Sequence, residues 1–328
     1  MRVYIAGPMS GLPNLNHEAF DAARDLIAGQ GHEPVSPADL GVAAGLTVRD
    51  AYGVVSVMPG VSWADSMRAD LAELVRCDAI AYLPGWETSA GAGLEHHVAF
   101  RLGLRRFELD LAAGRLEPIV VVGISGYARS GKDTVAAALV GRAGFRRVGF
   151  ADALKRAALA IDPLVAVDGA GRPGLRSRLL RAVGAGPRTP RLSTVVGERG
   201  WEDAKALPDV RRLLQRVGDE GGRRIHGEST WVDIALRTPG ARLVIPDVRF
   251  PNEAEVVTAA GGLLVRVERP GVGPANGHDS ENAIDGWDFA VRLRNDSTIE
   301  ALGDAGVSVV ERWMGERAAD EAPAQGRA

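Results

Sequence analysis

Apolar residues follow two patterns along this chain of 328 residues. Short runs of mostly β-branched apolar residues predict buried strands, and longer stretches with apolar residues at helical spacing predict helices. Strands and helices alternate through most of the sequence, which predicts parallel sheets with helices on both faces. The length favours two domains. The expected fold class is therefore α/β, with two doubly wound parallel-sheet domains.

The first domain is expected at residues 1–108. Its predicted strands are 2–6, 33–36 and 78–83, and its predicted helices are 16–28, 64–76 and 94–102. Residues 40–62 have no clear periodicity and are expected to form a loop or lid. The charged stretch from Gly103 onward, with 109–117 as the linker proper, is expected to be a short helical connection.

The second domain is expected at residues 118–314. Its predicted strands are 119–122, 147–150, 242–247, 263–268 and 289–293, and its predicted helices include 133–142, 201–205, 210–216, 252–260, one from Leu154 and one capped by 295–298. Residues 162–191 are rich in Gly, Pro and Arg and are expected to be a mobile lobe, either a lid over phosphates or a solvated loop. Residues 315–328 are expected to be a disordered tail.

Composition restricts the partners. A net charge of −3 gives no general attraction for nucleic acid or anionic membranes. No apolar run approaches the roughly 20 residues of a membrane span, and the strand that begins near residue 3 leaves no room for a signal peptide. The single cysteine, Cys77, excludes an intrachain disulfide and fits a cytoplasmic, reducing compartment and a small core residue. Small-molecule ligands are the expected partners.

A phosphate-binding motif stands between a predicted strand and a predicted helix. Residues 126–132 have the sequence G-Y-A-R-S-G-K, the pattern of a loop whose backbone amides hold nucleotide phosphates at a helix N-terminus. Lys132, one of only three lysines, is placed to reach the β- and γ-phosphates. The residues expected to bind ATP are Gly126, Ala128, Arg129, Ser130, Gly131, Lys132, Asp133 and Thr134.

Three residues near the loop are candidates to hold Mg²⁺. Asp133 stands where Ser or Thr usually ligates the ion, so either Thr134 takes that role or Asp133 acts near the metal or the acceptor. Asp247 ends a predicted buried strand, a place suited to holding Mg²⁺ or accepting a proton. ATP and Mg²⁺ are the expected cofactors.

Polar side chains also gather at the predicted strand ends of the first domain, where such sheets bind ligands. Glu95, expected on the first turn of a helix, suits a nucleophile toward a sugar carbon. Asp70 could protonate a leaving base, and a hydroxyl could hold the nucleophile. Alternatively, Glu95 is a helix-terminal carboxylate stabilised by the helix dipole and Asp70 is a solvated surface charge.

Three motifs in residues 2–104 resemble the nucleoside 2-deoxyribosyltransferase-like superfamily, which includes deoxynucleoside 5′-monophosphate N-glycosidases. They are Y-I-A-G-P-M-S-G, R-A-D-L-A-E-L-V-R-C-D-A-I and S-A-G-A-G-L-E-H-H-V-A. The resemblance implies a flavodoxin- or Rossmann-like fold with Glu95 as nucleophile, Tyr4 as its hydrogen-bonding partner and Asp70 as acid/base. It implies nucleotide contacts by Gly7, Ser10, Ser89 and Gly91. The segment G-W-E-T-S departs from the transferase pattern, which bears on base recognition.

An ordered series of motifs in residues 118–314 resembles the deoxynucleoside monophosphate kinases of tailed bacteriophages, in the P-loop kinase class. The series is G-Y-A-R-S-G-K-D-T, F-A-D-A-L-K, V-R-R-L-L-Q-R-V-G-D-E-G-G-R, S-T-W-V-D, P-D-V-R-F-P-N-E-A-E, H-D-S-E and N-D-S-T. The resemblance implies transfer of the γ-phosphoryl group of ATP to a deoxynucleoside monophosphate. The implied roles are catalysis by Lys132, Asp152, Asp247 and Arg249, and acceptor binding by Lys155, Arg211, Gln215 and Arg223.

Together these patterns predict a two-domain enzyme of nucleotide metabolism. Its relatives imply a phage-encoded protein of the host cytoplasm that forms homo-oligomers. The first domain is expected to cleave or transfer at the N-glycosidic bond, and the second to phosphorylate a deoxynucleotide. The alternative is that the first domain only senses or docks nucleotides and the second only binds them.

Overall fold

Three β-sheets organise the residues that the computed structural model describes, namely 1–50, 54–167, 189–274 and 283–321. The chain divides into two compact units, one of residues 1–148 with 237–328 and one of residues 149–236. Both five-stranded sheets lie in the first unit, which confirms the predicted α/β class.

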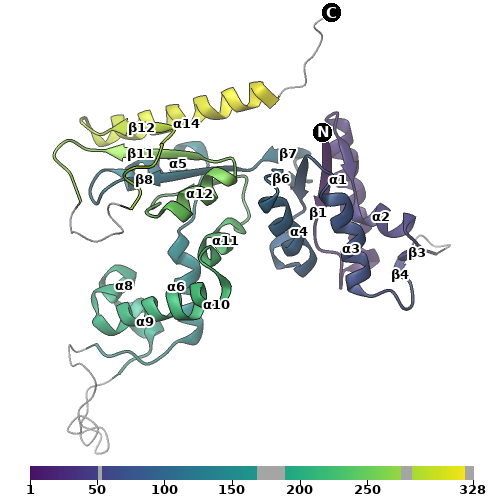
Figure 1. Cartoon of the computed structure of the whole chain (residues 1–328), viewed down its shortest axis with the longest axis horizontal. Coiled ribbons are helices and arrows are strands. Elements are labelled where there is room, and N and C mark those ends of the chain that lie inside the picture. Colours follow the sequence, from purple (N-terminus) through teal and green to yellow (C-terminus); the bar gives the residue numbers. More distant parts are fainter. Residues whose placement is uncertain (51–53, 168–188, 275–282, 322–328) are drawn as a thin grey trace, which may run out of the picture. The chain divides into compact units, whose positions relative to one another are not determined.

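The first sheet has the strand order β2-β1-β5-β6-β7; Figure 1 labels β1, β6 and β7. The first four strands in this order are parallel and β7 is antiparallel to β6. Their bounds are β1 (Arg2–Ala6), β2 (Glu33–Val35), β5 (Ala79–Tyr82), β6 (Arg105–Asp110) and β7 (Arg115–Pro118). Because the chain reverses its direction of progress across the sheet between β1 and β5, the carboxyl ends of these two strands form the crevice where such sheets bind ligands.

Helices cover both faces of this sheet. Successive side chains of β1 point to opposite faces, so each face has apolar residues against which a helix packs. Val3 and Ile5 pack with Phe20 and Ile27 of α1, whereas Tyr4 and Ala6 belong to a cluster on the other face. That second cluster contains residues of α3 and α4. The helical elements of this region are η1 (Pro13–Asn16), α1 (His17–Gly29), α2 (Pro37–Ala43), α3 (Trp63–Leu74), η2 (Trp86–Thr88) and α4 (Ala90–Arg101).

Two expectations for this region were wrong. Residues 40–62 contain part of α2 and an antiparallel hairpin of β3 (Thr47–Arg49) and β4 (Val55–Val57), not only loop. Residues 103–117 are not a helical linker, because β6 and β7 pair within the sheet. The sequence R-R-F-E-L-D alternates charged residues with the buried Phe107 and Leu109, and this period-two pattern is that of a strand.

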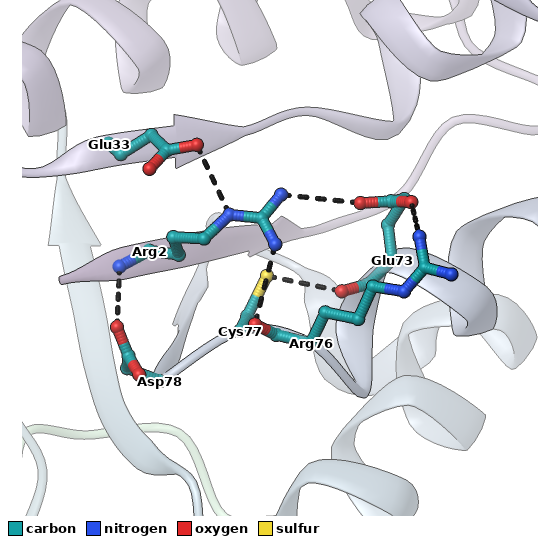
Figure 2. Close-up of polar contacts among 6 residues, drawn as sticks. All are labelled: Arg2, Glu33, Glu73, Arg76, Cys77 and Asp78. Atoms are coloured by element: carbon teal, nitrogen blue, oxygen red, sulfur yellow. Dashed lines mark hydrogen bonds and ion pairs between the residues drawn. The ribbon is translucent and has the colours of Figure 1, made fainter.

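Arg2, the first residue of β1, forms hydrogen bonds and ion pairs with residues of the neighbouring elements (Figure 2). Its Nε donates to Glu33 Oε1 at 3.1 Å, its Nη2 to Glu73 Oε2 at 3.3 Å, and its backbone N–H to Asp78 Oδ2 at 2.8 Å. These two glutamates raise the pKa of Arg2. Cys77 lies beside this network, donates from Sγ to Glu73 O, and is the buried small residue expected from the sequence; burial raises its pKa to about 11.

The second sheet is parallel throughout, with the strand order β12-β11-β8-β10-β9; Figure 1 labels β8, β11 and β12. Its strands are β8 (Val120–Ser125), β9 (Arg146–Arg147), β10 (Arg242–Ile245), β11 (Leu263–Glu268) and β12 (Val291–Arg294). The earliest strand, β8, is the central one, so the switch point of this sheet lies where β8 ends. The loop of residues 126–132 begins at that point.

Helices pack against this sheet through a core of β8, β11 and α5 side chains. The helices are α5 (Lys132–Ala143), α12 (Pro251–Ala259) and α14 (Ile299–Glu321). Thr298 accepts from the backbone N–H of Ala301 and so caps α14, as expected. The expected tail boundary was wrong, because α14 continues to Glu321. No helix among the described residues is long and apolar enough to cross a membrane.

The second unit, residues 149–236, is helical. Ala158, Val165, Leu192 and Val210 are among its core residues. Its elements are α6 (Phe150–Ile161), α8 (Leu192–Ala206), α9 (Pro208–Gly218), η3 (Asp219–Arg223), α10 (Arg224–His226) and α11 (Thr230–Leu236). The strand expected at 147–150 is only the two-residue β9, and most of the lobe expected at 162–191 lies outside the described residues.

Candidate active sites

The loop of residues 126–132 has a backbone that two glycines make possible. Gly126 has φ 154° and Gly131 has φ 106°, values that side chains disfavour. A Cβ on Gly126 would lie 2.6 Å from Val267 O, and one on Gly131 would lie 2.6 Å from Asn295 Nδ2. At both positions a larger residue would be strained in its backbone and would contact neighbouring atoms too closely. Between them, Ala128 and Arg129 are exposed to solvent.

Asn295 holds this loop in place. Its Nδ2 donates to Ser130 O at 2.7 Å, and its own backbone N–H donates to Glu268 O at 2.7 Å. Asn295 follows β12, so it ties the loop to the neighbouring strands of the sheet. The motif N-D-S-T predicted a helix cap and belongs to the kinase-like series, but neither use indicates this contact.

Ser130 has a buried hydroxyl whose hydrogen-bonding capacity is unused. The residue is 1% exposed, and its Oγ has no partner among the described residues. A buried polar atom without a partner costs free energy, and here it belongs to a loop of helix-terminal amides. An oxygen of a bound phosphate is the kind of group that would satisfy it.

Lys132 lies at the first position of α5 and is 8% exposed. Its Nζ is 3.7 Å from Asp247 Oδ1, and the other oxygen of Asp247 accepts a hydrogen bond from Arg249 Nε at 2.8 Å. Asp247 is two residues beyond the end of β10, which pairs with β8. The parallel pairing of these strands thus brings together three residues that the sequence analysis selected.

The residues around the loop fit a magnesium ion that is bound mainly by phosphates. Mg²⁺ generally uses one or two carboxylates, with waters and substrate phosphates as its other ligands. Asp247 is half-exposed and Thr134 lies on the first turn of α5. Asp133 forms an ion pair with Arg147, in which Asp133 Oδ1 lies 3.4 Å from Arg147 Nη2. Among the described residues, no group of three or more Asp, Glu, His or Cys forms a metal site by itself.

The remaining expected kinase residues lie in the second unit. Asp152 Oδ2 accepts from Gly149 N at 2.7 Å and so caps α6, and Lys155 Nζ is 3.6 Å from Asp152 Oδ1. Arg211 and Gln215 are both exposed on α9. Arg223 pairs with Asp219 at 2.8 Å, the surface ion pair that is the ordinary role for such an arginine. The catalytic and acceptor roles of these residues stay predictions.

A second candidate site lies in the first domain, as a cavity of about 310 Å³. Its lining includes six expected residues: Gly7, Ser10, Asp70, Ser89, Gly91 and Glu95. Leu46, Val57, Val61 and Trp63 form part of its apolar wall. The sequence analysis missed this wall because the segment around β3 and β4 has no periodic pattern.

Glu95 and Tyr4 meet inside this domain. Tyr4 Oη donates to Glu95 Oε1 at 2.6 Å, so the predicted hydrogen bond is present. Burial raises the pKa of Glu95 to about 8, although the Tyr4 hydrogen bond lowers it. Burial also raises the pKa of Tyr4 well above its ordinary value. Glu95 is on the second turn of its helix, not the first, because α4 already begins at Ala90.

Asp70 shares the cavity with Glu95 and is not a fully solvated surface charge. Burial raises its pKa to about 7. Thr47 Oγ1, which also lines the cavity, is buried without a partner among the described residues. Within that part of the chain no lysine or arginine lines the cavity. Two carboxyl groups whose pKa values burial raises toward neutral pH, with the unpartnered Thr47 hydroxyl beside them, suit general acid and nucleophilic chemistry.

Different parts of the chain match different known proteins. Residues 1–106 match the model of a domain of unknown function, DUF4406. A protein of Acanthamoeba polyphaga mimivirus, named "Putative deoxynucleotide monophosphate kinase", is 30% identical over 220 residues, which cover 59% of this chain and 97% of the viral protein. The uncharacterized protein ORF77 of Ictalurid herpesvirus 1 is 35% identical over 107 residues, 30% of this chain and 46% of that protein.

Two solved structures are similar over a comparable share of the chain. TT1252 from Thermus thermophilus is 19% identical, covering 59% of this chain and 97% of its own, with a TM-score of 0.27. A dephospho-CoA kinase from Campylobacter jejuni is 12% identical, covering 60% and 98%, with a TM-score of 0.28. These scores are too low to support an argument.

Proposed function

Because this chain belongs to the same family as the mimivirus protein named as a deoxynucleotide monophosphate kinase, we propose that residues 118–314 phosphorylate a deoxynucleoside monophosphate. The reaction moves the γ-phosphoryl group of ATP to an oxygen of the acceptor's 5′-phosphate. ADP and a deoxynucleoside diphosphate are the products.

The observation that supports this proposal best is the environment of Lys132. The side chain is buried at the start of α5, at the end of a glycine loop that contains an unpartnered serine hydroxyl. Its ammonium group faces Asp247 at 3.7 Å, a distance that leaves it available to phosphate oxygens. Buried cations need a counter-charge; Asp247 supplies one carboxylate, and a bound triphosphate would add further negative charge.

Catalysis in this class consists mainly of positioning and charge stabilisation. Lys132 and the amides at the start of α5 would hold the donor phosphates. Asp247, with Thr134 or Asp133, would hold Mg²⁺, which neutralises phosphate charge when bound. Arg249, which is oriented by Asp247, would stabilise charge on the transferred group. Asp152, Lys155, Arg211, Gln215 and Arg223 would bind the acceptor or its metal.

For the first domain we propose cleavage or transfer at the N-glycosidic bond of a deoxynucleoside or deoxynucleotide. The observation that favours this function is that Glu95 and Asp70 share one cavity and that Tyr4 holds Glu95. A Glu95 oxygen would attack C1′ of the sugar while Asp70 donates a proton to the departing base. Water or a second base would then attack C1′ and release Glu95.

One assay tests the kinase and a second tests the first domain. ADP release is measured over the common deoxynucleoside monophosphates and over modified ones, for the wild type, Lys132→Ala and the control Lys205→Ala, whose side chain is partly exposed. The proposal expects turnover that only Lys132→Ala abolishes. Nucleotide binding without turnover in the wild type would instead support a sensing role. Free base is measured by chromatography, and Glu95→Ala is expected to abolish its release.

A further inference from the structure

Arg106 is a buried cation that lacks a counter-charge. It lies on β6 and is 6% exposed. The only hydrogen bond of its side chain within the described residues runs from Nη2 to Ala260 O, at a long 3.4 Å. Its guanidinium also lies 5.3 Å from the ring of Phe100. No described carboxylate pairs with it, although an arginine stays protonated in proteins and buried charges are normally paired.

The helix end beside Arg106 compensates only part of this charge. Ala260 and Gly261 follow the end of α12, and a helix C-terminus has about half a negative elementary charge. That half charge is shared, because Arg317 of α14 donates to Gly261 O. Burial, and after it the positive charge of Arg317, lowers the pKa of Arg106. The charge of Arg106 is therefore only partly compensated.

Both arginines line one cavity of about 250 Å³. Arg105 also lines it. The rest of the lining is mainly apolar and includes Phe107, Ile119, Trp313 and Met314. The cavity is distinct from both candidate active sites, with which it shares no lining residue.

We propose that this cavity binds a small organic oxyanion, whose phosphate or carboxylate group pairs with Arg106 and Arg317 and whose apolar part packs against Trp313. The planar guanidinium fork matches either anion in a bidentate way. The ligand contacts β6 of the first sheet together with α14 of the second, so its binding stabilises both. This inference does not depend on either proposed reaction.

Titration calorimetry on the full chain tests the site with three probes of one shape. Phenyl phosphate and benzoate have the same ring and different anions, and benzyl alcohol is the neutral control. We expect one or both anions to bind and the alcohol not to bind. The anion that binds more tightly identifies the ligand class. Failure of both anions to bind would overturn the proposal.

Variants show whether the anion binds at this cavity and not at the 126–132 loop. Arg106→Met is expected to weaken binding at least tenfold, Arg106→Lys less, and the exposed control Arg312→Met, also on α14, hardly at all. Without ligand, Arg106→Met should melt at the wild-type temperature or above, because it removes a buried unpaired charge. If Arg106→Met does not fold, Arg317→Met replaces it. Unchanged anion binding in the folded variant would contradict the proposal.

Discussion

The hydroxyl of Tyr4 donates a 2.6 Å hydrogen bond to the carboxyl group of Glu95. The two residues lie far apart in the sequence and are both buried. Tyr4 comes from the third position of β1, and Glu95 comes from the second turn of α4. A bond of this length orients one carboxyl oxygen and leaves the other available to a ligand.

Removing that hydroxyl should slow the first domain without unfolding it. Tyr4→Phe is expected to lower kcat/KM for base release by about 10- to 100-fold, the effect of one hydrogen bond to a charged group. The matched control is Tyr82→Phe, because the Tyr82 hydroxyl meets His96 Nδ1 at 2.8 Å and not Glu95. Equal losses in both variants would show that the effect is packing and not orientation of Glu95.

Base release should have a bell-shaped pH profile with its maximum between about pH 7 and 8. A nucleophilic Glu95 must be ionised, and burial raises its pKa to about 8. An acidic Asp70 must be protonated, and burial raises its pKa to about 7. Because the two carboxyl groups interact, the pKa values read from the two limbs of the profile belong to the pair and not to either residue. kcat/KM measured from pH 5 to 10 checks this, and Asp70→Asn should remove the alkaline limb.

The ligand-free protein should lose stability as the pH rises toward 8. Glu95 has a folded-state pKa of about 8 against an ordinary 4.5, so the folded state keeps a proton that the unfolded state has lost. The contribution of Glu95 to the free energy of unfolding is fully present below the pKa that this group has in the unfolded state. Between that pKa and the folded-state pKa it declines by up to about 1.4 kcal/mol per pH unit. Denaturant unfolding at pH 5, 6, 7 and 8 measures the slope. Glu95→Gln should flatten it, and an unchanged slope would assign it to other groups.

Replacing Gly131 should disable the phosphate loop. Gly131→Ala places a Cβ 2.6 Å from Asn295 Nδ2 at a backbone with φ 106°. We expect a loss of about 1–3 kcal/mol in stability and a large rise in the Kd for ATP, measured by calorimetry. Gly141→Ala in the same helix is the control, because nothing lies within 4 Å of its new Cβ. That control should be neutral or stabilising.

Asn295 should affect nucleotide binding through the loop that it holds. Asn295→Ala removes the 2.7 Å hydrogen bond to Ser130 O, so the loop loses its fixed conformation. We expect the KM for ATP to rise about fivefold, the effect of roughly 1 kcal/mol. The KM for the acceptor should change less. Steady-state kinetics with each substrate varied in turn distinguishes this from a general loss of folding.

The sequence predicted those parts of the fold in which one local pattern dominates. The apolar run of β8 and the glycines at 126 and 131 determine a strand and a turn by themselves, and the structure has both. The C-terminal end of α14 was not predicted, because the helix continues past residue 315 and no helix-terminating sequence signal marks its end. The strand β6 was mistaken for a helix because its charges at Arg105 and Glu108 hid the alternation.

Contacts between distant residues were predictable only where a motif marked both partners. Tyr4 and Glu95 were paired through a resemblance to a family, not through spacing. Asn295 and Ser130 were not paired, because an asparagine before a helix has an adequate local explanation as a cap. Arg106 was missed for a similar reason. One arginine among many in a charged segment gives no indication that its side chain is buried.

The hydrogen bonds of Ile119 and Val120 show where this protein can be divided. Ile119 N–H donates to Arg106 O of the first sheet, and the next N–H, from Val120, donates to Ala241 O of the second region. The two sheets thus follow each other with no spacer. A fragment ending at residue 108 would lack β7 and would truncate β6, leaving an unpaired strand edge that invites aggregation. Expression of the first domain alone should therefore extend through Pro118, where its last strand ends.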